Sequence, residues 1–407
     1  MRGGIGRLVA YWRAERRTIA QGFAALLISS LGSLIAGVAL GSITHTLDRL
    51  PGLLVLLPAA IGMRGNIFGA LGSRLGTSIH TGLFAPSRQR EGILYQNIYA
   101  ATVLTFSISL LLGVLAKTLS VAFGVTSISV VDFAVISILA GLLSSVVVGA
   151  FTVALSIQAH RRGWDLDSVA APLITAAGDI VTIPSLFLAS FAVGIHWVTP
   201  SIATIAAVLA AVITIRGLLT DLTTTRRVLR ESLPLLILAG TIDVFAGLVL
   251  EQRLEHFLVF PALLVLVPPF LEAAGALGGI LSSRLASKLH LGVLSTRGRP
   301  DSIAMLDFSI IVLFASVTFA LTGVAAHLAA LVVGRASPGI AAMIGISMLG
   351  GAIATLSAIG VAYYTAVAIF RRGLDPDNFG IPLITSSMDF IGVIALAIAI
   401  VAAGVAP

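Results

Sequence analysis

The chain has 407 residues, of which 57% are hydrophobic and 11% are charged, with a mean hydropathy of +1.06. Because soluble globular proteins carry about 25% charged residues, this composition excludes a soluble protein and predicts a polytopic membrane protein. The chain contains no cysteine, which excludes a disulfide framework, a thiolate metal site and a cysteine nucleophile. Its formal charge of +7 comes mostly from arginines between apolar segments, so we assign this charge to membrane topology and expect no nucleic-acid partner.

Apolar segments of the ~20 residues needed to cross a bilayer recur along the whole chain. They cover residues 19–45, 51–82, 93–118, 130–158, 169–197, 200–216, 233–252, 257–290, 302–330, 340–368 and 379–405. We therefore predict an all-α polytopic membrane protein with eleven spans. No long soluble stretch separates them, so we expect no soluble regulatory or catalytic domain.

An internal repeat relates the two halves of the chain at an offset of 210 residues (389 − 179). Residues 161–179 read RRGWDLDSVAAPLITAAGD, and residues 371–389 read RRGLDPDNFGIPLITSSMD. PGLLVLLP at 51–58 is likewise repeated as PALLVLVP at 261–268. Five spans are duplicated, and the span at 200–216 belongs to neither copy. The predicted domains are a first five-helix repeat at 1–197, a linker helix with its connection at 198–231, and a second five-helix repeat at 232–407.

The extra span sets the predicted orientation of the repeats. Five is an odd number, so directly fused copies would be inverted, whereas one added crossing makes the two halves parallel. With a cytoplasmic N-terminus and an external C-terminus, seventeen arginines lie inside, and four basic residues lie outside. The inner set is Arg2, Arg7, Arg13, Arg16, Arg17, Arg88, Arg90, Arg161, Arg162, Arg216, Arg226, Arg227, Arg230, Arg297, Arg299, Arg371 and Arg372, and the outer set is Arg49, Lys117, Arg253 and Arg335.

Two aspartates, Asp179 and Asp389, occupy equivalent places in the repeats, about ten residues into their spans. That depth is ~15 Å, the midplane of the bilayer, where a carboxylate costs at least ~2.5–3.5 kcal/mol. Two carboxylates that face one another repel unless a cation lies between them. A structural hydrogen bond between helices is the simpler explanation of one such aspartate, but the matched pair favours an ion site.

The other candidate ligands at this depth are also oxygen groups. Asn66 reaches the midplane from the second span, and Thr175 and Thr385 stand close to the prolines that precede the aspartates. Oxygen ligands select a hard cation such as Mg²⁺ or Ca²⁺, and so sparse a site suits Mg²⁺, which keeps several of its waters. Gly65 and Gly275 begin glycine-rich runs typical either of close helix packing or of a pore lining.

The halves differ in their acidic residues. The second half has acidic residues where the first half has serine, glycine and asparagine; they are Asp243, Glu272 and Asp307. Conversely, Ala276 stands in the second half at the position that Asn66 occupies in the first. Glu272 is a candidate second ion site, proton-coupling group or extracellular gate. Asp243 and Asp307 are secondary candidates.

These motifs resemble the MgtE-type magnesium transporters, and specifically their two-domain relatives in solute carrier family 41. The resemblance rests on PLIT followed by aspartate at 172–179 and 382–389, on Gly65-Asn66, and on Ser73-Arg74-Leu75 repeated at 283–285. It implies a cation path between paired five-helix domains, with Asp179 and Asp389 as the main ion residues and Asn66 as a further one. Because Ala276 departs from the pattern, the resemblance does not imply a symmetric site.

The sequence therefore predicts a cell-membrane transporter or channel for divalent cations, Mg²⁺ first, that works as a monomer with pseudo-dimeric halves and is not an enzyme. It leaves open a channel or an exchanger coupled to Na⁺ or H⁺, the direction of transport, and Ca²⁺ or Mn²⁺ as the ion. Two alternatives are a secondary transporter of small organic solutes and an aspartate-dependent membrane enzyme. The enzyme is disfavoured because the paired aspartates lack a water-activating partner motif.

Overall fold

The computed structural model of the chain describes residues 10–85, 87, 89–162, 166–295, 298–372 and 376–405. The side chains of residues 18, 80, 166–172, 376–379 and 381 lie outside this description, among them that of Pro172, the proline that precedes Thr175 and Asp179. The described chain is helical throughout and contains no strand. Its helices are α2 (Arg16–Ser42), α3 (Thr44–Arg49), α4 (Leu53–His80), α5 (Ile93–Ala122), α6 (Val130–Arg162), α7 (Leu166–Ser190), α8 (Val198–Leu218), α9 (Thr223–Gln252), α10 (Leu254–Val259), α11 (Ala262–His290), α12 (Ser302–Val332), α13 (Ile340–Arg371) and α14 (Pro376–Ala402).

Eleven of the described helices are long and apolar enough to cross a membrane, which confirms the predicted number of spans. Only α3 and α10, with six residues each, are too short. They stand at equivalent places in the repeats, between the first and second spans of each copy. Prolines inside α4, α9, α11 and α14 do not break these helices, as expected where neighbouring helices shield the freed carbonyls.

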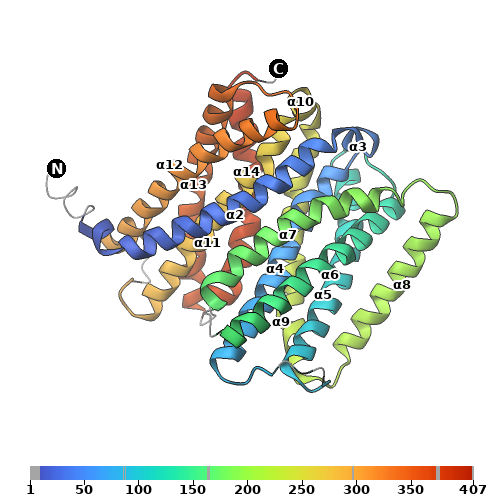
Figure 1. Cartoon of the computed structure of the whole chain (residues 1–407), viewed down its shortest axis with the longest axis horizontal. Helices are drawn as coiled ribbons and strands as arrows, with labels where there is room; N and C mark the ends of the chain where they lie inside the picture. The colour runs from blue at the N-terminus through green and yellow to red at the C-terminus, as the bar shows by residue number, and fades with distance from the viewer. Residues whose placement is uncertain are drawn as a thin grey trace. The chain divides into compact units, whose positions relative to one another are not determined.

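The helices pack into two compact units that differ from the two sequence repeats. Unit 1 comprises Met1–Gly41 and His256–Pro407, and unit 2 comprises Ser42–Glu255. Helix α2, which opens the first repeat, therefore packs in unit 1 with α11–α14. Helix α9, which opens the second repeat, packs in unit 2 against α4 and α5. Each repeat has exchanged its first helix with the other, as the chain colours in Figure 1 let the reader follow.

Glycine permits the close approach of each exchanged helix. A Cβ added at Gly37 of α2 would overlap the carbonyl oxygen of Val265 in α11. A Cβ added at Gly247 of α9 would overlap the carbonyl oxygen of Val55 in α4. The two glycines are 210 residues apart, and so are the two valines, so both units use the same glycine-to-backbone contact. Any side chain larger than hydrogen would force these helices apart.

The extra span, α8, packs on α5 and α6 of unit 2 (Figure 1). Its contact with α5 includes a 2.6 Å hydrogen bond between the hydroxyls of Ser107 and Thr214. Only 22% of the residues in its most apolar 18-residue stretch are buried, which is the lowest share among the eleven spans. An apolar helix so little covered by protein is suited to contact with lipid along most of its surface.

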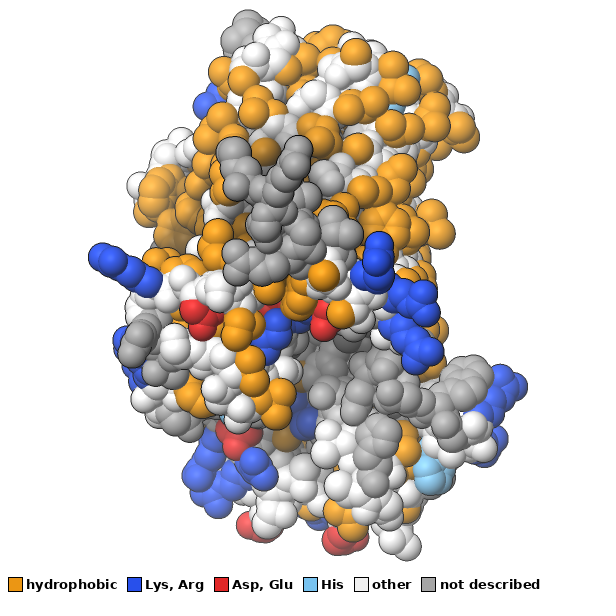
Figure 2. Space-filling view, turned by 90° about the vertical axis from the view of Figure 1, so that its left-hand side faces the viewer, with side chains coloured by type: hydrophobic (Ala, Val, Ile, Leu, Met, Phe, Trp, Pro, Cys, Tyr) orange, Lys and Arg blue, Asp and Glu red, His pale blue; other side chains and the backbone are white. Residues whose placement is uncertain are grey.

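Large apolar side chains remain exposed on both units, as a bilayer-embedded protein requires. Val146 and Leu356 are 71% and 72% exposed although they lie in the middle of long helices. Figure 2 shows one face, on which hydrophobic side chains cover large areas and lysine and arginine gather in separate patches. Exposed apolar area on this scale marks a surface covered by lipid or by protein.

Candidate ion-binding site

In unit 2 the predicted ligands lie where α7 meets α4. A Cβ added at Gly65 of α4 would stand 4.0 Å from the Oγ1 of Thr175, and one at Gly178 would stand 4.0 Å from the backbone nitrogen of Gly65. Asp179 follows Gly178 and is 2% exposed. Thr175 and Asp179 are four residues apart and therefore share one face of α7. The structure thus brings together Gly65, Thr175 and Asp179.

Unit 1 repeats this arrangement with α11 and α14. A Cβ added at Gly275 would stand 3.9 Å from the Cβ and Cγ2 of Thr385. Asp389 lies one turn further along the same face of α14 and is half-buried. The hydroxyl of Thr385 donates to the backbone carbonyl of Pro382 at 3.1 Å, so this hydroxyl already has a partner on its own helix.

Asn66 is half-buried on α4 beside Gly65, and its Nδ2 is buried without a hydrogen-bond partner among the described residues. An amide without a partner in a membrane interior is costly, so such groups are usually retained for a functional reason. The equivalent residue in unit 1 is Ala276, which offers no polar atom. Unit 2 therefore carries one more polar group at this level than unit 1.

The exchanged helices distribute the remaining acidic candidates between the units. Asp243 of α9 is fully buried in unit 2. On either side of it along α9, Gly240 approaches Met63 of α4 and Gly247 approaches Val55 of α4. Sequence order assigned Asp243 to the second half, whereas packing places it with the helices of the first.

Glu272 of α11 and Ser29 of α2 form a hydrogen bond inside unit 1, with the serine hydroxyl as donor. This bond joins the exchanged helix α2 directly to α11. The equivalent pair in unit 2 is Gly62 and Ala239, neither of which has a polar side chain. The pair formed by Glu272 and Ser29 therefore has no polar side-chain counterpart at the equivalent place in unit 2.

Asp307 of α12 is fully buried in an ion-pair cluster at one end of α11. Its carboxylate accepts from Arg284 Nε at 2.9 Å and from Lys288 Nζ at 2.6 Å. The Tyr11 hydroxyl donates to this carboxylate at 2.7 Å. The Oε2 of Glu15 lies 3.3 Å from the Nη2 of Arg284. Both carboxylate oxygens of Asp307 are engaged, so in this arrangement the residue anchors the N-terminal segment and its neighbouring cations.

Tyr11 lies before the first span, and burial raises the pKa of its phenol above the usual value of 10.0. The hydrogen bond from Lys288 opposes this shift, and the neighbouring Asp307 adds to it. The phenol therefore keeps its proton at neutral pH and remains a donor to Asp307. In unit 2 the acceptor at the equivalent place is a neutral amide. There Arg74 Nε donates to Asn97 Oδ1 at 2.7 Å.

Two buried charged residues were missed by sequence reasoning. Arg64 is 2% exposed, and its guanidinium donates to the carbonyl of Gly141 at 2.8 Å and to the hydroxyl of Ser145. Its Cβ lies 3.4 Å from a Cβ placed at Gly178, so the start of this side chain packs where α4 meets α7, while its guanidinium is bound to α6. The signal was an arginine in the interior of an apolar segment, to which the cost argument used for the aspartates applies equally.

Glu251, at the end of α9, was the second such residue. Its carboxylate accepts from the backbone N–H of Gly52 at 2.6 Å and of Leu54 at 3.1 Å. An acidic side chain at this place satisfies free donors at the start of α4 and interacts favourably with the helix dipole. This contact fixes α9 against the helix that carries Asn66. The sequence signal was an acidic residue at the C-terminal end of an apolar span.

Comparison with known proteins supplies the family. The MgtE family model, described as a divalent cation transporter, matches residues 57–189 and again residues 267–399. The two matches are offset by the same 210 residues as the repeat and together cover more than half of the chain. The chain belongs to the MgtE family.

The MgtE matches cover α4–α7 and α11–α14, and so contain every candidate ligand except Asp243. Its relatives include solute carrier family 41 member 3 of Rattus norvegicus, 25% identical over 92% of this chain and 84% of the relative. Member 2 of Xenopus laevis is 24% identical over 91% of this chain and 69% of the relative, and human member 2 is 22% identical over 91% and 68%. No solved structure shows a significant match to the chain. The predicted resemblance is confirmed, and divalent cation transport is the activity of the family.

Proposed function

We propose that this protein transports Mg²⁺ across the membrane and that Asp179 and Asp389 contact the ion. The observation that carries the proposal is the repeated arrangement of glycine, threonine and aspartate, once where α4 meets α7 and once where α11 meets α14. Two equivalent carboxylates placed by independent pairs of helices support a role that the two repeats share. A purely structural aspartate would have no reason to keep the same glycine and threonine neighbours in both.

The chemistry of the candidate ligands supports a hydrated hard cation. Within the described residues, no three histidine, aspartate or glutamate side chains gather into a metal-binding cluster. An ion that passes here therefore meets few carboxylates and some neutral oxygens, such as those of Thr175 and Asn66. Mg²⁺ exchanges its waters reluctantly, so a sparse site that contacts the ion partly through water suits it better than Ca²⁺, which takes six to eight oxygen ligands.

Release of the ion is favoured by the charge of Arg64. A dication held only by carboxylates in a medium of low dielectric constant would bind too tightly to leave quickly. Arg64 precedes Asn66 by two residues on α4, and the hydrogen bonds of its guanidinium to described residues go to two neutral oxygens, those of Gly141 and Ser145. We expect it to weaken ion binding in unit 2 relative to unit 1, where Ala274 is its equivalent.

Inward movement needs no second ion, because a membrane potential of 100 mV is worth ~4.6 kcal/mol to a divalent cation. Outward movement needs coupling to Na⁺ or H⁺, and for that role we propose Glu272. Its partner is the hydroxyl of Ser29, which can donate to a carboxylate or accept from a carboxylic acid. The residue can thus hold or lose a proton without losing its hydrogen bond.

The central test measures Mg²⁺ flux into proteoliposomes that enclose a Mg²⁺-sensitive dye. Asp179→Asn and Asp389→Asn should each reduce the rate at least about tenfold, since each removes one of two charges that attract the ion. Asp132→Asn makes the same chemical change at the exposed start of α6, where the carboxylate bonds only to Ser129, and should transport as the wild type does. Folded Asp179 or Asp389 variants with wild-type flux would remove the proposal.

Two further measurements refine the result. The double variant Asp179→Asn, Asp389→Asn should lose little more than either single variant if both carboxylates serve one ion, and the losses should multiply if they serve two. Flux with and without a Na⁺ or pH gradient tests coupling. Glu272→Gln should flatten the pH dependence of the Mg²⁺ flux. Gly62→Ala, the matched change in the other repeat, should leave that pH dependence unchanged. Equal and negligible effects would make Glu272 a packing residue.

A further inference from the structure

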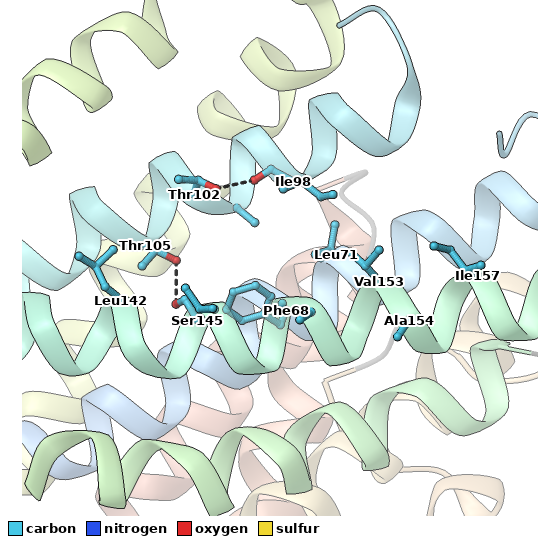
Figure 3. Close-up of a pocket in the computed structure, with 14 residues that line it drawn as sticks. Phe68, Leu71, Ile98, Thr102, Thr105, Leu142, Ser145, Val153, Ala154 and Ile157 are labelled. Atoms are coloured by element: carbon cyan, nitrogen blue, oxygen red, sulfur yellow. Dashed lines mark hydrogen bonds between the residues drawn. The ribbon is translucent and has the colours of Figure 1, made fainter. Parts of the chain in front are cut away.

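A groove of about 570 Å³ opens on the surface of unit 2 between α5 and α6. Figure 3 shows Ile98 and Thr102 of α5 on one side, and Val153 and Ile157 of α6 on the other. Phe68 of α4 contributes to the buried floor. The rim is open, since neighbouring side chains such as Val146 remain largely exposed. All three helices are long and apolar enough to cross a membrane, and the exposed apolar side chains at the rim are suited to contact with lipid.

The hydroxyl groups that line the groove already have partners within the protein. Thr102 donates to the carbonyl of Ile98 at 2.9 Å, and the hydroxyls of Thr105 and Ser145 lie 3.1 Å apart in a hydrogen bond (Figure 3). Ser145 also accepts from Arg64, behind the groove wall. A polar solute would find no side-chain hydroxyl here in need of a hydrogen bond, whereas a hydrocarbon chain would leave none unsatisfied. The lining therefore selects an apolar occupant.

The equivalent position in unit 1 is filled by the protein itself. Phe308 and Tyr363 stand 210 residues after Ile98 and Val153, and their rings meet edge to face with centroids 6.0 Å apart. Tyr363 is 1% exposed. The groove thus exists in unit 2 because two smaller residues replace an aromatic pair. Atoms that line an unfilled groove lack packing partners on one side, so an apolar occupant would add van der Waals contacts there.

The ends of the groove indicate what kind of apolar molecule enters. Leu142 and Ile157 line its two ends on α6, about 22 Å apart along the helix, which is more than the ~15 Å depth of one leaflet. Arg161 is exposed one turn beyond Ile157 on the same face. Tyr95, 37% exposed, lies one turn before Ile98 on α5. A tyrosine and an arginine at one end mark the headgroup level of a membrane.

We propose that this groove binds one acyl chain of an anionic phospholipid, whose headgroup pairs with Arg161. The chain enters from the leaflet level with Arg161, which the positive-inside rule makes the cytoplasmic one. It packs along α6 towards Ser145, in the space that Phe308 and Tyr363 fill in unit 1. In the described part of unit 1, Phe308 and Tyr363 fill the equivalent place, so we expect the protein to bind one such lipid tightly, not two.

Native mass spectrometry of the purified, delipidated protein titrated with phosphatidylglycerol or phosphatidylcholine tests the proposal. The wild type should retain one phosphatidylglycerol more tightly than any phosphatidylcholine. Ile98→Phe combined with Val153→Tyr transfers the aromatic pair of unit 1 into the groove and should abolish this tight binding. Val147→Tyr adds a tyrosine to the exposed surface of the same helix, outside the groove, and should bind lipid as the wild type does.

Two other variants separate the headgroup from the chain. Arg161→Gln should reduce the preference for phosphatidylglycerol about fivefold, the effect of one basic residue near a membrane surface, and leave phosphatidylcholine binding unchanged. Ala150→Leu, at the exposed rim, narrows the groove without altering the core and should weaken both lipids, which keeps the test valid if the double variant does not fold. Equal binding of the two lipids by the wild type, or undiminished phosphatidylglycerol binding in the folded filled variants, would overturn the proposal.

Discussion

The substitution Asp307→Asn leaves two cations at one end of α11 without their closest counter-charge. Asp307 is fully buried and lies 2.6 Å from Lys288 and 2.8 Å from Arg284. Asparagine keeps the shape of the side chain but turns one acceptor into a donor that faces these donors. Breaking a buried ion pair costs about 3–5 kcal/mol, and we expect about 3 kcal/mol because the side chains of Arg284 and Lys288 are 13% and 20% exposed.

Two measurements detect this loss. The Tm of the purified protein should fall by several degrees, and trypsin should cleave after the exposed Arg13 at least about tenfold faster, because Tyr11 no longer has a carboxylate to hold it. Asn97→Asp is the matched control in unit 2, where the carboxylate would face Arg74 and the Tm should change little. If Asp307→Asn and Asn97→Asp left Tm and cleavage alike, the cluster would not anchor the N-terminal segment.

Three more substitutions test the fold. Gly247→Ala places a methyl group against the backbone carbonyl of Val55 and should lower the free energy of unfolding by about 1–3 kcal/mol. The control is Gly345→Ala, where no atom lies within 4 Å of the added Cβ, and thermal unfolding should find this variant as stable as the wild type or more stable. Glu251→Gln removes a charge that accepts two N–H groups at the start of α4 and should lower stability by about 1 kcal/mol; an unchanged Tm would mean that water replaces it. Single cysteines at Ser168 and Asn378 should both react with an impermeant thiol reagent from the cytoplasmic side only, and labelling from opposite sides would refute the parallel orientation of the repeats.

The sequence alone determined the class of protein, the number of spans and the family. Long apolar segments must be helical in a bilayer, because their backbone groups have no other hydrogen-bond partners there, so composition and length settle the secondary structure. The repeat was visible because the motifs at 172–179 and 382–389 keep their spacing without gaps. The predicted common depth of Asn66, Thr175 and Asp179 drew attention to the second and fifth spans, and the structure places Gly65 beside Thr175.

The tertiary structure alone decided which helices pack in the same unit. Sequence order places α2 with α4 and α9 with α11, but the contacts of Gly37 with Val265 and of Gly247 with Val55 reverse this assignment. The glycine that makes the close contact stands at the equivalent place in both helices, at Gly37 and Gly247, so its position does not show which repeat supplies the partner. Arg64 and Asp307 illustrate the same limit for charges. Their residue types were readable from the sequence, but Arg64 donates to α6, and Asp307 accepts from Arg284 of α11 and from Tyr11. Whether a buried charge attracts an ion or anchors a helix depends on those partners, and packing is what supplies them.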